Sequence, residues 1–76
     1  MNDRRRAILA NARELLEKAA LLVERAADEE SDCFSNLPES IQEGERGEKM
    51  EAAIDLLEEA QDQIDEILDK IEEASA

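Results

Sequence analysis

The 76-residue chain contains no histidine, tryptophan or tyrosine, and its only cysteine is Cys33. Without histidine, the sequence has neither the Glu-x-x-His zinc motif of metalloenzymes nor a histidine-based catalytic triad. A lone cysteine without a neighbouring histidine is a poor zinc ligand or catalytic thiol. Carboxylates are abundant, but acid–base catalysis needs one that is desolvated in a pocket, and a chain this short offers little room for one. We therefore predict a non-enzymatic protein with no metal and no cofactor.

Cations are scarce in this sequence. Lysine and arginine number nine against 22 aspartates and glutamates, which gives a formal net charge of −13. Because proteins that bind phosphate backbones do so through Lys and Arg, we expect no direct nucleic-acid partner. An acidic surface suits a basic protein partner instead. The alternative is that the charge only keeps a small oligomer in solution.

Long apolar runs are also missing. No stretch approaches the roughly 18 apolar residues of a membrane-spanning helix. Polar residues soon interrupt the segment after the basic run Arg4–Arg6, so it does not predict a signal peptide. A single cysteine cannot form an internal disulfide, which fits a reducing compartment. The sequence thus predicts a soluble cytoplasmic protein with no membrane partner.

Two segments repeat apolar residues at helical spacing, which predicts helices over about residues 3–30 and 48–74. The first segment carries one row of Ile8, Ala12, Leu15, Ala19, Leu22 and Ala26, and a second row of Leu9, Leu16 and Val23. The second segment carries Met50, Ile54, Leu57, Gln61, Ile64, Leu68 and Ile71, with Ala53, Ala60, Ile67 and Ala74 beside them and Leu56 at the edge. Gln61 is either a polar residue tolerated at the bundle edge or a buried layer that sets the register.

The width of these bands predicts how the helices associate. Each band covers about 160° of its helix, whereas one facing helix covers about 100°. Apolar surface therefore remains on both helices after they pack together. The basic run Arg4–Arg6 comes to lie beside Asp69, Glu72 and Glu73, and Asp28–Glu30 beside Arg46 and Lys49, only if the helices are antiparallel. We predict an all-α fold, an antiparallel helical hairpin that assembles into a homo-oligomeric helix bundle.

Residues 31–47 join the two helices and contain the only proline and both glycines. Asn36 followed by Glu39 matches a capping box, with Pro38 in the first turn, so we expect a helix from about residue 37. Ile41 is out of phase with the stripe that begins at Met50. Either a short helix spans about 37–43 and bends at the glycines, or the long helix turns this face toward another chain.

The same segment resembles a family of short proteins from phages, prophages and other mobile elements of Gram-positive gut bacteria. The matching positions are Glu29, Glu30, Phe34, Asn36, Leu37, Pro38, Glu39, Ser40, Gln42, Glu45, Arg46, Gly47, Glu48 and Met50. Cys33 and Gly44 depart from the family pattern. The resemblance implies a small accessory protein acting in the cytoplasm of a bacterial host, and it assigns no activity.

Two surfaces are candidate binding sites. The central motif offers Phe34, Asn36, Glu39, Ser40, Gln42, Glu45, Arg46 and Lys49. The second helix offers an acidic face of Asp55, Glu58, Glu59, Asp62, Asp65, Glu66 and Asp69, flanked by Glu51 and Glu73. The acidic face predicts an inhibitor of a basic host protein, in keeping with a counter-defence role. The alternatives are an oligomer that sequesters an anionic signal such as a nucleotide at the motif, and a structural assembly protein.

Overall fold

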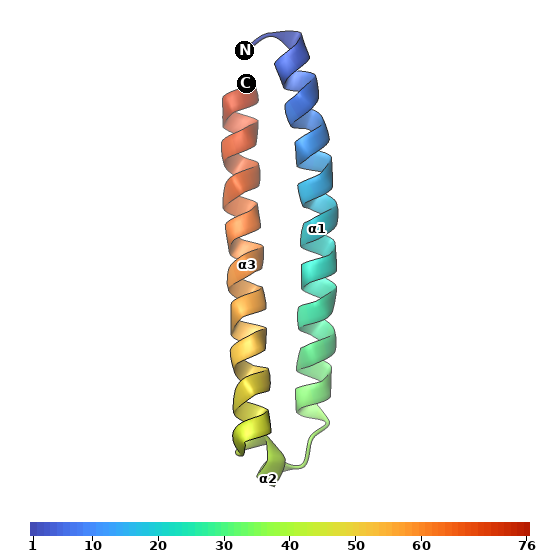
Figure 1. Cartoon of the computed structure of the whole chain (residues 1–76), viewed down its shortest axis with the longest axis vertical. Coiled ribbons are helices and arrows are strands. Elements are labelled where there is room, and N and C mark those ends of the chain that lie inside the picture. Colours follow the sequence, from blue (N-terminus) through green and yellow to red (C-terminus); the bar gives the residue numbers. More distant parts are fainter.

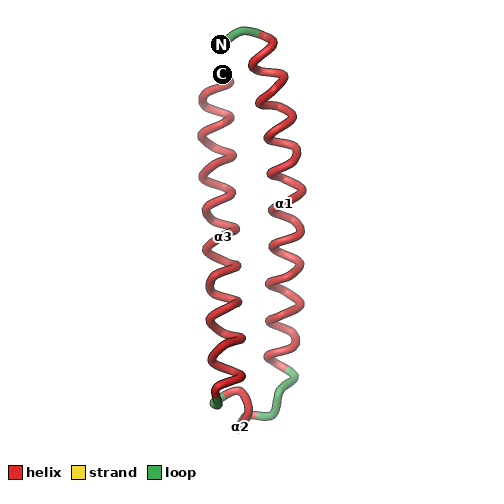
Figure 2. Tube along the Cα trace, in the orientation of Figure 1, coloured by secondary structure: helices red, strands yellow, loops and turns green.

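The computed structural model describes all of residues 1–76 and contains three helices and no strand. They are α1 (Asp3–Ser35), α2 (Glu39–Gln42) and α3 (Glu45–Ser75). Only the termini and the short connections on either side of α2 lie outside helices (Figure 2). The prediction of an all-α protein, in which one long helix packs on another, is confirmed. No segment with the length and apolarity of a membrane span occurs among the helices.

Helices α1 and α3 lie side by side and run in opposite directions, so that the two termini meet at one end and α2 closes the other (Figure 1). The Cα positions extend over 58 × 15 × 12 Å. At the terminal end, the Arg6 Nε donates a hydrogen bond to the Ser75 carbonyl at 3.1 Å, and Arg13 pairs with Glu72 at 3.9 Å. The cations at the start of α1 thus meet the C-terminal end of α3, where the helix dipole favours them.

The seam between the long helices follows a spacing of three and four residues. On α1 the side chains with reduced exposure are Leu9, Ala12, Leu16, Ala19, Ala20, Val23, Ala27, Glu30 and Phe34. On α3 they are Met50, Ala53, Ile54, Leu57, Ala60, Gln61, Ile64, Leu68, Ile71 and Ser75. All seven members of the predicted α3 stripe are therefore half-buried. Only Ala27 and Gly47 are buried outright in the whole chain, so this seam is a single thin layer.

The two predicted rows of α1 are covered unequally in the structure. Leu9, Leu16 and Val23 all face α3, whereas the other row divides: Ala12 and Ala19 line the seam, and Ile8, Leu15, Leu22 and Ala26 stay exposed. Each exposed member lies one residue, or about 100°, before a seam residue, so α3 does not cover it. We expected apolar surface to remain uncovered on both helices after they pack together. The structure shows such surface on α1 and also on α3, where Leu56 and Ile67 are exposed.

The first helix runs five residues further than predicted, to Ser35. Glu30 and Phe34 continue the seam spacing of Val23 and Ala27, so packing on α3 supports this acidic last turn. Asn36 is consequently the C-cap of α1, and the predicted capping box is absent. Pro38, with φ −56° and ψ 145°, is the N-cap of α2, and no side chain caps that helix. Of the two alternatives for this segment, the structure has the short helix, which covers four residues, Glu39–Gln42, within the expected span 37–43.

Gly47 explains why α3 starts at Glu45 rather than near residue 48. The chain leaves α2 and re-enters a helix at the N-cap Gly44, which brings the backbone of Gln42 directly against Gly47. A Cβ at position 47 would overlap the Gln42 carbonyl, so only glycine permits this approach. Gly44 has ordinary room, since its nearest neighbours would lie 3.5 Å from an added Cβ.

The predicted charge pairing at this turn is not formed. Lys49 pairs with Glu45 at 3.3 Å and Arg25 pairs with Glu29 at 3.4 Å, each within its own helix. Arg46 takes part in no ion pair. Exposed pairs contribute little in either arrangement, so the turn is held by backbone packing and hydrogen bonds rather than by charge.

The close approach at Gly47 yields a first testable prediction. We expect Gly47→Ala to lower the free energy of unfolding by about 1–3 kcal/mol, because the overlap with the Gln42 backbone outweighs the helix propensity gained by alanine. Urea denaturation followed by circular dichroism at fixed protein concentration measures the change. Gly44→Ala is the matched control and should cost less than about 1 kcal/mol. Equal losses in the two variants would contradict the packing account.

Candidate functional site

Gln42 is the most constrained polar residue of the central motif. Its side-chain Nε2 donates hydrogen bonds to the backbone carbonyls of Phe34 at 3.0 Å and Leu37 at 3.1 Å. Phe34 belongs to the last turn of α1, and Leu37 follows that helix; the Phe34 carbonyl also accepts the backbone N–H of Leu37 at 3.1 Å. Both amide hydrogens of Gln42 are thereby used inside the chain. Gln42 ties α2 to the end of α1, which is a structural task.

The other predicted motif residues surround this turn without enclosing a cavity. Phe34 is half-buried at the end of the seam, and Asn36 bonds through its backbone N–H to Asp32 and Phe34. The exposed members are Asn36, Glu39, Ser40, Glu45, Arg46 and Lys49. The one pocket of the structure lies at the far end of the molecule. An anion site at the motif therefore stays a prediction.

The acidic residues of α3 form a continuous outer surface, which we call the acidic wall. It consists of Glu51, Asp55, Glu58, Glu59, Asp62, Asp65, Glu66, Asp69 and Glu73. All nine side chains are exposed and none forms an ion pair. Positions 51 to 73 span about 33 Å at the rise of an α-helix. Like charges four residues apart, such as Asp55 and Glu59, each cost about 0.2–0.5 kcal/mol of helix stability.

The acidic wall faces away from α1. Its members fall between the seam positions of α3, on the side of the helix opposite to Leu57, Ile64 and Ile71. The cations that α1 directs toward α3 reach other groups, since Arg6 bonds to Ser75 and Arg13 pairs with Glu17 and Glu72. The wall is thus a rigid, uncompensated array of carboxylates on one helix.

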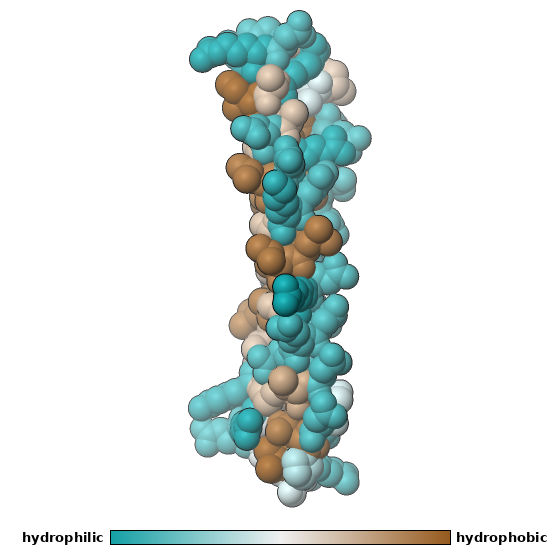
Figure 3. Space-filling model, turned by 90° about the vertical axis from the view of Figure 1, so that its right-hand side faces the viewer, coloured by the Kyte–Doolittle hydropathy of each residue, from teal (hydrophilic) through white to brown (hydrophobic).

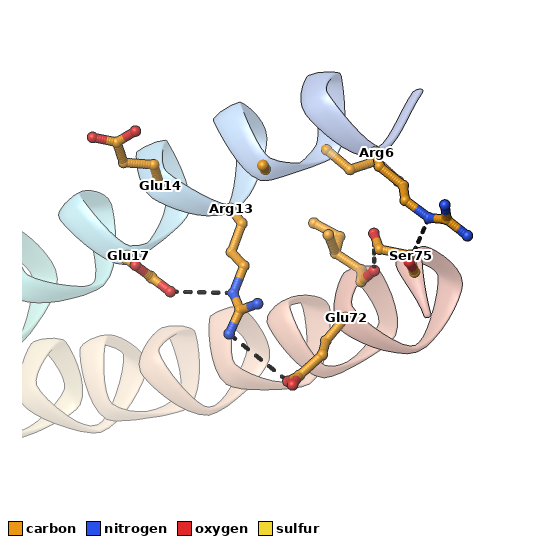
Figure 4. Close-up of a pocket in the computed structure, with 9 residues that line it drawn as sticks. Arg6, Arg13, Glu14, Glu17, Glu72 and Ser75 are labelled. Atoms are coloured by element: carbon orange, nitrogen blue, oxygen red, sulfur yellow. Dashed lines mark hydrogen bonds and ion pairs between the residues drawn. The ribbon is translucent and has the colours of Figure 1, made fainter. Parts of the chain in front are cut away.

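A pocket of about 250 Å³, which was not predicted from the sequence, lies between α1 and α3 at the terminal end (Figure 4). Arg13 extends between Glu17, at 3.3 Å, and Glu72, at 3.9 Å. Arg6 reaches the carbonyl of Ser75. Both arginines are occupied by acceptors of this chain, and Glu14 adds a further negative charge to the lining. The arrangement neutralises its own cations and leaves none for an anionic ligand.

Comparison with known proteins adds no family to these observations: no family model, no curated protein and no solved structure matches this chain. The structure also contains no group of three or more Cys, His, Asp or Glu side chains arranged to hold a metal ion. The candidate surfaces are therefore argued from their own geometry.

The bonding of Gln42 yields a second prediction. Gln42→Glu removes the amide donor and sets a carboxylate against two carbonyl oxygens, so we expect about 1–3 kcal/mol of destabilisation. Ser40→Ala is the control, because the Ser40 side chain is exposed and makes no hydrogen bond in the chain. Thermal unfolding of both variants measures the difference. If Ser40→Ala were the more damaging change, Gln42 would not hold the turn.

Proposed function

We propose that this chain is a non-enzymatic binding protein that docks on a basic surface of another protein through the acidic wall. The observation that carries the proposal is the uncompensated charge of α3, where nine exposed carboxylates have no cationic partner. By contrast, half of the acids of α1 are paired with cations, among them Glu14 and Glu17 at 3.5 and 3.3 Å. The wall keeps its mutual repulsion, which a basic partner relieves on binding.

In this proposal the chain acts as a homo-oligomer of helical hairpins, because a single hairpin leaves apolar residues of both long helices exposed. The resemblance to proteins of phages and mobile elements makes a host defence protein with a basic surface, such as a nuclease, the first partner class to test. Capture of an anionic signal at the motif has less support, since Gln42 is committed to the turn and the pocket lies elsewhere.

A pair of charge-matched variants tests the acidic wall. The wall variant carries Asp55→Asn, Glu58→Gln and Asp62→Asn, and the control carries Glu24→Gln, Asp28→Asn and Asp32→Asn on α1. Each loses one glutamate and two aspartates that are exposed and unpaired. Both therefore have the same net charge.

The probe is a lysine-rich helical peptide of matching length, and its Kd is measured by fluorescence anisotropy. We expect the wall variant to weaken binding about tenfold and the control less than about threefold, because each exposed pair contributes about 0.2–1 kcal/mol. Both effects should shrink as salt is raised. If the two variants weakened binding equally, net charge alone would account for the affinity, and the proposal of a defined docking surface would be wrong.

A thermal-shift panel separates this proposal from capture of an anion. A ligand present at a hundred times its Kd stabilises a protein by about 2.7 kcal/mol, which raises the melting temperature of a chain this small by several degrees. We expect no such rise with inorganic phosphate, nucleoside phosphates or cyclic nucleotides at millimolar concentration. A rise that disappears in Arg46→Ala would move the binding site from the wall to the central motif.

A further inference from the structure

Besides Leu21, five large apolar side chains stay exposed along the two long helices: Ile8, Leu15, Leu22, Leu56 and Ile67. Each directly precedes a seam residue in the sequence, namely Leu9, Leu16, Val23, Leu57 and Leu68. A residue that precedes a seam residue points about 100° away from the seam, around the axis of its helix. Because α1 and α3 face each other and run in opposite directions, these preceding residues point to the same side of the helix pair on both helices. The five residues therefore share one face, which we call the apolar face.

The contacts at the terminal end show which residues of α1 and α3 lie at the same height along the helix pair. Arg6 meets Ser75 and Arg13 meets Glu72, so Leu15 lies level with about residue 68 and Leu22 with about residue 61. Leu15 therefore lies beside Ile67, and the apolar residues follow one another from Ile8 to Leu56, with the polar Gln63 and Lys70 between them on α3. Figure 3 shows hydrophobic side chains gathered along one edge of the face over α1, with hydrophilic groups covering most of the rest.

The surface area indicates what covers the apolar face. A compact monomer of 8.5 kDa exposes about 4,650 Å², whereas this chain exposes 5803 Å². The excess, about 1,150 Å², is larger than the roughly 800 Å² that each partner buries in a standard protein interface. One partner laid along the whole face would therefore remove most of it. A second copy of the chain offers an apolar surface of the same length and width.

Charges beside the apolar face select how a second copy lies on it. On α1 the flanking row contains Arg4, Lys18 and Arg25, with Asn11 and Asp32 in the same row. On α3 it contains Glu59, Glu66 and Glu73, which also belong to the acidic wall. The α1 edge of the face is thus mainly basic and the α3 edge is acidic. Within one chain Lys18 and Arg25 make only exposed pairs with Glu14 and Glu29, at 3.5 and 3.4 Å. Such pairs are weak and exchange readily.

We propose that two copies of the chain form a dimer through the apolar face, with α1 of each lying antiparallel on α3 of the other. The two-fold axis runs parallel to the helices, and both α2 turns lie at the same end of the resulting four-helix bundle. This arrangement sets Lys18 level with Glu66 of the second copy, and Arg25 level with Glu59 of the second copy. Lys70, also near this edge, falls level with the uncharged Asn11. The opposite orientation, α1 on α1, brings the basic edges together and is disfavoured.

Adjacent leucines provide a matched test of the surface. Leu22, 65% exposed, belongs to the apolar face, whereas Leu21, 66% exposed, points away from it. Sedimentation equilibrium should give a wild-type dimer at micromolar concentration. We expect Leu22→Glu to raise the dimer Kd by at least about tenfold, because both copies place a charge in the interface, and Leu21→Glu to change it less than about threefold. Circular dichroism verifies that both variants remain helical.

The orientation is tested separately with charge reversal and a distance measurement. Lys18→Glu and Glu66→Lys should each weaken the dimer, and the double variant should restore it. A spin label on the exposed Cys33 should report a distance under about 30 Å between copies, since the turns share one end; turns at opposite ends would give more than about 40 Å. Stronger association on Lys18→Glu, or the longer distance, would overturn the arrangement.

This inference specifies the self-association within the proposed function, and its failure is distinguishable from failure of the acidic wall. A wild-type monomer at micromolar concentration would overturn the dimer, whichever other molecule covers the face. Equal effects of Leu21→Glu and Leu22→Glu would overturn the choice of surface. The lysine-rich peptide should still bind to monomeric Leu22→Glu, because Leu22 lies outside the wall.

Discussion

The structure depends on one thin layer of apolar contact between two antiparallel helices. Each helix buries a stripe against the other, and nothing lies behind that stripe: only Ala27 and Gly47 are fully buried. A helix pair can satisfy one stripe per helix, whereas the apolar bands here are wider than one stripe. Because the two helices bury so little apolar surface, a lone chain has limited stability and keeps an apolar face available to a partner. Stability and assembly are therefore two consequences of a single geometric limit.

The turn at α2 decides which residues share a face. Gly47 lets the backbone of Gln42 approach α3, and the Gln42 amide holds the end of α1. Together these contacts set the axial register of α1 against α3. A shift of one helical turn between the helices, about 5.4 Å, would move Leu15 away from Ile67. A segment with few apolar atoms thus controls the surface chemistry along the whole rod.

The sequence predicted the helices well because their periodicity is long and regular, and the α3 stripe from Met50 to Ile71 is the one that packs. It could not assign the two rows of α1, because Ile8, Leu15 and Leu22 are as apolar as Leu9, Leu16 and Val23. Only the partner helix distinguishes them. Asn36 and Gln42 were ambiguous for a different reason: an amide that bonds a backbone carbonyl and one that binds a ligand have the same sequence signature. The turn geometry resolves that ambiguity for Gln42.

The acidic wall and the apolar face share only a border on α3, formed by Glu59, Glu66 and Glu73. Assembly through the apolar face therefore engages that border and leaves the rest of the wall, such as Asp55, Asp62 and Asp69, free. In the proposed dimer the two α3 helices occupy diagonal corners of the bundle, and their walls point outward in opposite directions. Such a dimer presents two identical docking surfaces that cannot contact one flat partner together. It would instead bridge two partner molecules, or two basic sites on a larger assembly that reaches around the bundle. In the second case the tethering of one site to the other raises the effective concentration for the second contact. Weak exposed charge pairs, each of little value alone, then add up to a useful affinity.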